Sequence, residues 1–111
     1  MTLPEIIRRL LPCLALLGIS ACTAGPPVQE MSDARQAIAA AREAGAATLA
    51  GDGLVVAETR LAEAEVQLQE RMYRNAKRLA LGAKESAIAA LLSSRSQREA
   101  GATATPDVPS R

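Results

Sequence analysis

Alanine recurs at alternating spacings of four and three residues in the C-terminal half of the chain, and this pattern constrains the fold more than any other. The repeated positions are Ala76, Ala80, Ala83, Ala87 and Ala90, and this apolar stripe is widened by Leu79, Ile88, Leu91 and Leu92. Residues spaced in this way lie on one side of an α-helix and need a facing helix to cover them. Because the side chain of alanine is short, two helix axes can approach closely along such a seam. The pattern therefore predicts an all-α fold.

Two further stretches have helical periodicity. Apolar and small residues recur at helical spacing between 33 and 50, and a second stripe contains Leu54, Ala57, Leu61, Ala64 and Leu68. With a third helix at 72–96, they predict an alanine-rich antiparallel hairpin or three-helix bundle over residues 31–96. Since neither Gly nor Pro occurs between Leu54 and Leu81, one continuous helix over 54–96 remains an alternative to helices at 54–70 and 72–96.

Capping signals indicate where the first helix begins and ends. Ser32 and Asp33 are favourable N-cap residues, and Gln36 stands three positions after Asp33, as in a capping box. Gly51 is expected to end this helix in the left-handed conformation, and Asp52 to cap the next one.

The first 21 residues have the layout of a secretory signal. Arg8 and Arg9 precede an apolar run from Leu10 to Ile19, and small residues follow. The run is too short for a membrane-spanning helix, which needs about 20 residues. We therefore expect residues 1–21 to be a cleaved signal peptide.

The residues Ile19-Ser20-Ala21-Cys22 resemble a bacterial lipobox. The Cys22 thiolate would accept a diacylglycerol, and cleavage before it would free an amine for a further acyl chain. Cys13 follows Pro12 after almost no apolar run, so we interpret it as a residue of the leader. Residues 22–30 are expected to be the lipidated cysteine and a flexible Gly/Pro tether. Thr23 is not the aspartate associated with inner-membrane retention, so the resemblance implies an outer-membrane protein facing the periplasm.

Three segments, MSDARQAIAAA from Met31, LAEAE from Leu61 and YRNAKRLA from Tyr73, together resemble the proteobacterial lipoproteins of domain of unknown function 4398. The resemblance covers about residues 30–92. It implies a small helical domain, which in some members precedes an OmpA-like, peptidoglycan-binding domain; no such segment follows here, so no binding residues are carried over. The segment from Tyr73 is also similar to a helix of tetratricopeptide-like hairpins, except that Arg71-Met72 replaces the usual Gly or Asp before it.

The residues available for catalysis are few. The chain has no His, and its carboxylates are not arranged as an acid–base pair, because Glu63 and Glu65 lie on different helix faces. Asp52 lacks the further oxygen ligands of a calcium loop. We therefore expect no enzyme activity, no cofactor and no metal site, and the formal net charge of +1 gives no indication of nucleic-acid binding.

Charge is unevenly distributed between the second and third predicted helices. Residues 54–70 carry a net charge of −3 and residues 71–98 a net charge of +6. One interpretation is that the two helices pair through these charges. The other is that a basic face binds a partner or anionic ligand, and its residues are Arg71, Arg74, Lys77 and Arg78.

These observations predict an outer-membrane-anchored periplasmic lipoprotein that acts as a structural or protein-interaction module of the cell envelope. The expected partners are the membrane, through the lipid, and an envelope protein or a second copy of the chain. The alternative is a module that binds anionic envelope polymers such as peptidoglycan or lipopolysaccharide. Residues 97–111 lose the apolar stripe and are expected to be disordered.

Overall fold

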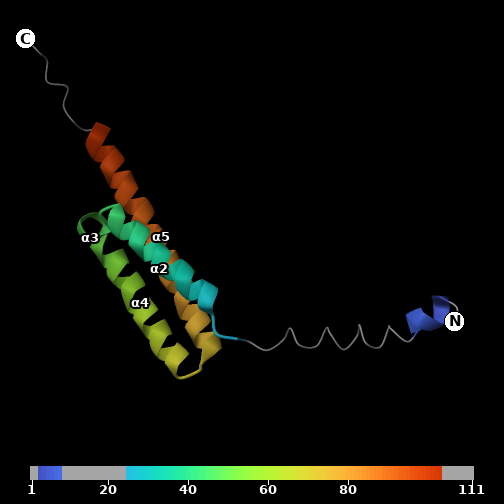
Figure 1. Cartoon of the computed structure of the whole chain (residues 1–111). Helices are drawn as coiled ribbons and strands as arrows, with labels where there is room; N and C mark the ends of the chain where they lie inside the picture. The colour runs from blue at the N-terminus through green and yellow to red at the C-terminus, as the bar shows by residue number, and fades with distance from the viewer. Residues whose placement is uncertain (1–2, 9–24, 104–111) are drawn as a thin grey trace, which may run out of the picture.

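The computed structural model describes residues 3–8 and 25–103 (Figure 1). Residues 3–8 are helical. The predicted lipobox with Cys22, the residue after it and the chain beyond residue 103 lie outside the described residues. The described part beyond residue 25 contains four helices and no strand, which confirms the all-α prediction.

The helices are α2 (Val28–Glu43), the single turn α3 (Ala46–Leu49), α4 (Gly51–Gln69) and α5 (Tyr73–Thr103). Figure 1 shows α2 leading up to α3, α4 returning beside it, and α5 running back in the direction of α2. Helix α5 packs most extensively against α4 and next against α2, whereas α2 and α4 share a smaller contact. Helix α5 is therefore the element that holds the other two together.

The core is narrow because alanine supplies most of it. Among the described residues, eleven of the fourteen buried apolar side chains are alanines, and the other three are Met31, Ile38 and Leu54. All five alanines of the predicted seam are buried: Ala76, Ala80, Ala83, Ala87 and Ala90. Each alanine removes little apolar area from water, so stability depends on close helix approach over a long contact.

Helix α2 begins earlier than the capping signals predict. Its N-cap is Pro27, and the Met31 amide donates to the Pro27 carbonyl at 3.0 Å. Residues 28–30, predicted to belong to the tether, are therefore helical, and the predicted caps Ser32 and Asp33 lie inside the helix. Burial of Met31 against Ala64 and Ala80 gives the first turn a packing contact that capping rules do not consider.

The first helix also ends earlier, at Glu43, and the left-handed residue that follows it is Gly45 and not Gly51. Gly45 has a φ of 84°, in the left-handed region, and its amide donates to the Arg42 carbonyl at 2.9 Å. Ala50 is the N-cap of α4, while Gly51 and Asp52 lie in its first turn. The predicted roles of Gly51 as a stop and Asp52 as a cap are therefore wrong, because Gly45 provides the left-handed turn six residues earlier.

The segment between α4 and α5 is a sharp turn, so residues 54–96 do not form one helix. The Arg71 amide donates to the Leu68 carbonyl at 3.1 Å, and the Met72 amide donates to the Gln67 carbonyl at 2.8 Å. This is a Schellman motif, whose left-handed position is usually glycine. Here Arg71 occupies that position with a φ of 59°.

Helix α5 continues through Thr103, so residues 97–103 are helical and not disordered as predicted. The side-chain amide Nε2 of Gln97 donates to the Leu49 carbonyl at 2.7 Å, which joins α5 to the end of α3. The Arg98 guanidinium lies against Gly45, the N-cap residue at the start of α3. These polar contacts extend the helix beyond its apolar stripe, which is why the stripe alone underestimates its length.

Candidate functional site: the basic end of the bundle

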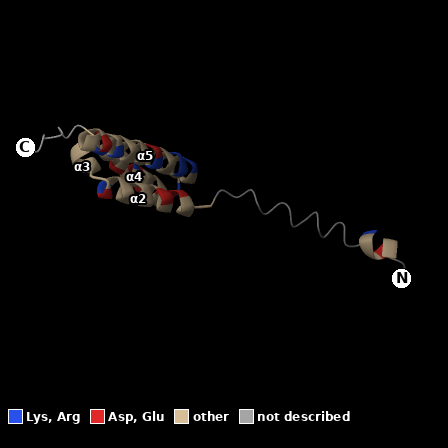
Figure 2. Ribbon diagram, turned by 90° about the horizontal axis from the view of Figure 1, so that it is seen from above, with Lys and Arg blue, Asp and Glu red and all other residues tan. Residues whose placement is uncertain are grey.

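The predicted basic residues Arg71, Arg74, Lys77 and Arg78 gather where the chain passes from α4 to α5. We call this set the basic end. Figure 2 shows basic residues concentrated at the end of α5 that lies beside the start of α2. Their surroundings differ, however, and they do not form the single helix face that the spacing predicts.

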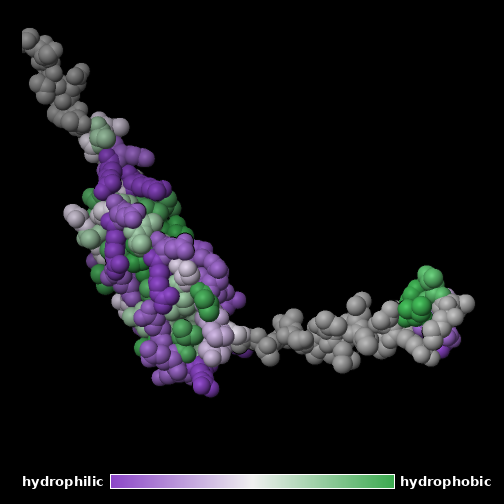
Figure 3. Space-filling view, viewed as in Figure 1, coloured by the Kyte–Doolittle hydropathy of each residue, from purple (hydrophilic) through white to green (hydrophobic). Residues whose placement is uncertain are grey.

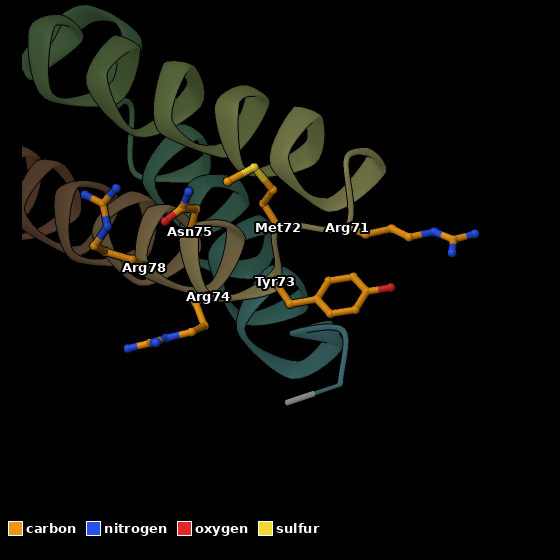
Figure 4. A pocket seen from close by; sticks show the side chains of 6 residues that line it. All are labelled: Arg71, Met72, Tyr73, Arg74, Asn75 and Arg78. Atoms are coloured by element: carbon orange, nitrogen blue, oxygen red, sulfur yellow. The ribbon is translucent and has the colours of Figure 1, made fainter. Parts of the chain in front are cut away.

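Arg71 lies in the turn before α5, so its left-handed backbone takes it off the helical face that holds Arg74 and Arg78. Figure 4 shows Arg71 and Tyr73 pointing away from the end of the bundle, with Arg74 and Arg78 along α5. Arg71, Arg74 and Arg78 are all exposed. No side-chain hydrogen bond or ion pair is formed by these three arginines within residues 25–103.

Lys77 differs from the three arginines because it turns toward α2. Its Nζ lies 3.4 Å from Oε1 of Glu30, in the first turn of that helix. Two turns along α5, Lys84 pairs in the same way with Asp33 at 3.3 Å. Both pairs are partly exposed and join α2 to α5, so Lys77 contributes to the packing of the bundle.

The predicted charge pairing between α4 and α5 is wrong. The four ion pairs of the described residues all involve α2, which offers acidic residues to α5 and basic residues to α4. Arg42 donates to one carboxylate oxygen of Glu58 through Nη2 at 2.6 Å and Nε at 3.0 Å, and Arg35 pairs with Glu65 at 3.1 Å. The prediction failed because it considered the charges of only two helices. The signal that could have found these pairs is the spacing of Arg35 and Arg42, which lie seven residues apart.

Helix α4 contacts α5 through Arg60 in place of a carboxylate. The Arg60 Nη1 donates to Ser86 Oγ at 2.7 Å and to the Gly82 carbonyl at 3.2 Å. The Arg60 side chain packs over Gly82, where an added Cβ would meet the Arg60 Cδ at 3.5 Å, an ordinary van der Waals contact. Arg60, Arg74 and Arg78 line a shallow groove between the two helices.

Tyr73, the only aromatic residue of the chain, stands at the first position of α5 and is half-buried. It lines a small depression with Arg74 and Lys77 from α5 and with Gly25, Pro26 and Pro27 before α2. The chain that leads to Cys22 therefore enters the bundle at its basic end.

A second surface runs along the outer side of α5. Leu81, Ile88 and Leu92 are 42%, 39% and 57% exposed, at spacings of seven and four residues. The sequence placed Ile88 and Leu92 in the core stripe, but α2 and α4 do not cover them. Figure 3 shows apolar surface between hydrophilic side chains along the bundle.

The described residues contain no group of three His, Cys, Asp or Glu side chains placed to hold a metal ion. Of the carboxylates considered from the sequence, Glu58 and Glu65 are engaged by arginines of α2. None of the helices within residues 3–8 and 25–103 has both the length and the apolar content needed to cross a bilayer.

No family model, curated protein or solved structure matches the chain. The resemblance to the lipoproteins of domain of unknown function 4398 therefore stays a prediction.

Proposed function

We propose that this protein is a lipid-anchored module of the outer membrane that faces the periplasm and acts by contact, with an envelope protein or with copies of itself. The observation that carries the interaction role is the exposed apolar row Leu81, Ile88 and Leu92 on α5. Large apolar side chains aligned on one side of a helix favour association with another helix.

The anchor part of the proposal rests on the lipobox before Cys22. Mass spectrometry of the protein purified from membranes tests it directly. We expect a chain that begins at Cys22 and carries acyl groups. A chain that retains its leader, or an unmodified Cys22, would contradict the anchor.

The interaction part is tested by site-specific photo-crosslinking in intact cells. A photoreactive amino acid at Ile88 is expected to give one discrete crosslinked product, either a dimer of this chain or an adduct with one envelope protein. The same amino acid at Glu99, which is exposed on α5 beyond the apolar row, serves as the control. Equal or absent crosslinking at both positions, together with a monomer in sedimentation at all concentrations, would count against this role.

The second candidate function is binding of anionic envelope polymers, and it is favoured by the exposed side chains of Arg71, Arg74 and Arg78, which pair with no residue of the described part of the chain. Arginine forms paired hydrogen bonds with carboxylates and phosphates. A pull-down with purified peptidoglycan tests this function when all four residues of the basic end are replaced by serine. Retention that does not change with these substitutions would remove it.

A further inference from the structure

The basic end is also the end at which the chain arrives from Cys22. Pro27 is buried as the N-cap of α2, and Gly25, Pro26 and Pro27 share a depression with Tyr73 and Arg74. Gly25 therefore lies beside Arg74 at the basic end.

The distance from Cys22 to this end is limited by covalent geometry. Gly25 follows Cys22 by three residues, and a fully extended chain spans at most about 3.6 Å per residue. If Cys22 carries the proposed lipid, the Cα of Gly25 lies within about 11 Å of the Cα of the acylated residue. This is the greatest separation, and a less extended tether brings Gly25 within the Debye length of about 8 Å at physiological salt, where charges at this end act on the lipid surface.

The unpaired arginines lie at that end. Arg71, Arg74 and Arg78 are exposed and make no ion pair with any described residue, whereas Lys77 pairs with Glu30. Three carboxylates lie near this end: Glu70 accepts a hydrogen bond from Gln67, Glu30 pairs with Lys77, and Glu85 lines the groove that contains Arg74 and Arg78. Tyr73 stands between the arginines, and tyrosine is favoured at membrane interfaces because it has an apolar ring and a polar hydroxyl.

We propose that Arg71, Arg74 and Arg78 dock onto the phosphates of anionic lipids in the leaflet that holds the anchor. This inference rests on the proposed acylation of Cys22. The docked end turns the start of α5 toward the membrane and directs the far end of α5 away from it. Each arginine near an anionic surface is expected to raise the ratio of docked to undocked protein by about fivefold.

Tyr73 provides a native probe for this proposal, because the chain contains no other aromatic residue. The acylated full-length protein is reconstituted in vesicles of phosphatidylcholine, or of phosphatidylcholine with about one third phosphatidylglycerol, each containing a lipid with a spin-labelled headgroup. Docking is expected to quench tyrosine fluorescence more strongly in the anionic vesicles, and added salt is expected to relieve the difference.

The matched variants are Arg74→Ser with Arg78→Ser, and Arg95→Ser with Arg98→Ser. Both double variants remove two arginines from α5, but the second pair lies at the opposite end of the helix. We expect the first variant to lose most of the quenching specific to phosphatidylglycerol, and the second to retain it.

The outcomes separate the two proposals. An unacylated Cys22 would overturn the anchor and the docking together. An acylated protein whose quenching is the same in both kinds of vesicle, or is reduced equally by both variants, would overturn the docking and leave the anchor. If the Arg74/Arg78 variant loses peptidoglycan retention without any change in quenching, these arginines bind the polymer and the docking proposal is overturned.

Discussion

Gly53 of α4 lies directly against Ala90 of α5: a Cβ added to Gly53 would stand 3.3 Å from the Cβ of Ala90. The contact is closer than two alanine side chains normally allow, so glycine and alanine together let the two axes approach at the α3 end of the bundle. The packing of the shallow core therefore depends on small side chains at specific positions such as Gly53 and Ala90.

Replacing Gly53 by leucine is expected to destabilise the bundle by about 1–3 kcal/mol, because the new side chain must displace α5. Gly51→Ala is the control, since an added Cβ there meets no atom within 4 Å. That change is expected to stabilise the bundle by about 0.5 kcal/mol through lower backbone entropy in the unfolded chain. Urea unfolding followed by circular dichroism measures both effects, and a Gly53→Leu variant as stable as the original would contradict the close approach.

The alanine seam is expected to reject a large side chain on its buried side only. Ala87 is fully buried, in a cluster with Ile38 and Leu54, whereas its near neighbour Ala89 is exposed. Ala87→Leu is expected to cost about 1–3 kcal/mol from overpacking, and Ala89→Leu to change stability by less than about 0.5 kcal/mol. Thermal unfolding of the two variants compares them, and equal midpoints would show that the seam is not closely packed.

Arg71→Gly is expected to stabilise the turn between α4 and α5. An L-residue in the left-handed region pays roughly 1 kcal/mol that glycine does not pay. Arg71→Ala is the control, because it removes the same charge but keeps the strained backbone. A gain in unfolding free energy of about 1 kcal/mol for glycine over alanine is expected in urea titrations, whereas equal stability of the two variants would show that the turn is not strained.

The pair Arg42–Glu58 is expected to tolerate a swap of its two charges, but not a change of sign at one partner alone. Glu58→Arg places like charges together and is expected to cost about 1 kcal/mol, since the partners are more than one third exposed and screened by solvent. Adding Arg42→Glu restores opposite charges and is expected to recover most of that loss. A double-mutant cycle in low salt measures the coupling, and a coupling of zero would show that the contact does not help align α2 with α4.

The buried side of each helix could be predicted from spacing alone. Ala34, Ile38 and Ala41 are buried on α2, and the five-alanine seam is buried on α5, as periodicity predicts. Periodicity failed where the third helix was given a wider stripe. Ile88 and Leu92 were assigned to the core because they are apolar, but the core holds only the side of α5 that two neighbours cover.

Helix ends and the candidate site were harder to predict because tertiary contacts decide them. Met31 extends α2 toward its start, and Gln97 extends α5 toward its end, although neither contact is local in sequence. The basic residues were identified from the uneven distribution of charge along the sequence. Which of them stay free, however, depends on Glu30, whose partner Lys77 is 47 positions away.

Helix α5 is longer than its neighbours: it has 31 residues, whereas α2 has 16 and α4 has 19. At a rise of 1.5 Å per residue, about 45 Å separate its first residue, Tyr73, from its last, Thr103. If the Tyr73 end rests on the membrane, the helix works as a spacer of set height. A partner recognised at its far end would then be selected by how far it stands from the bilayer as much as by its surface chemistry.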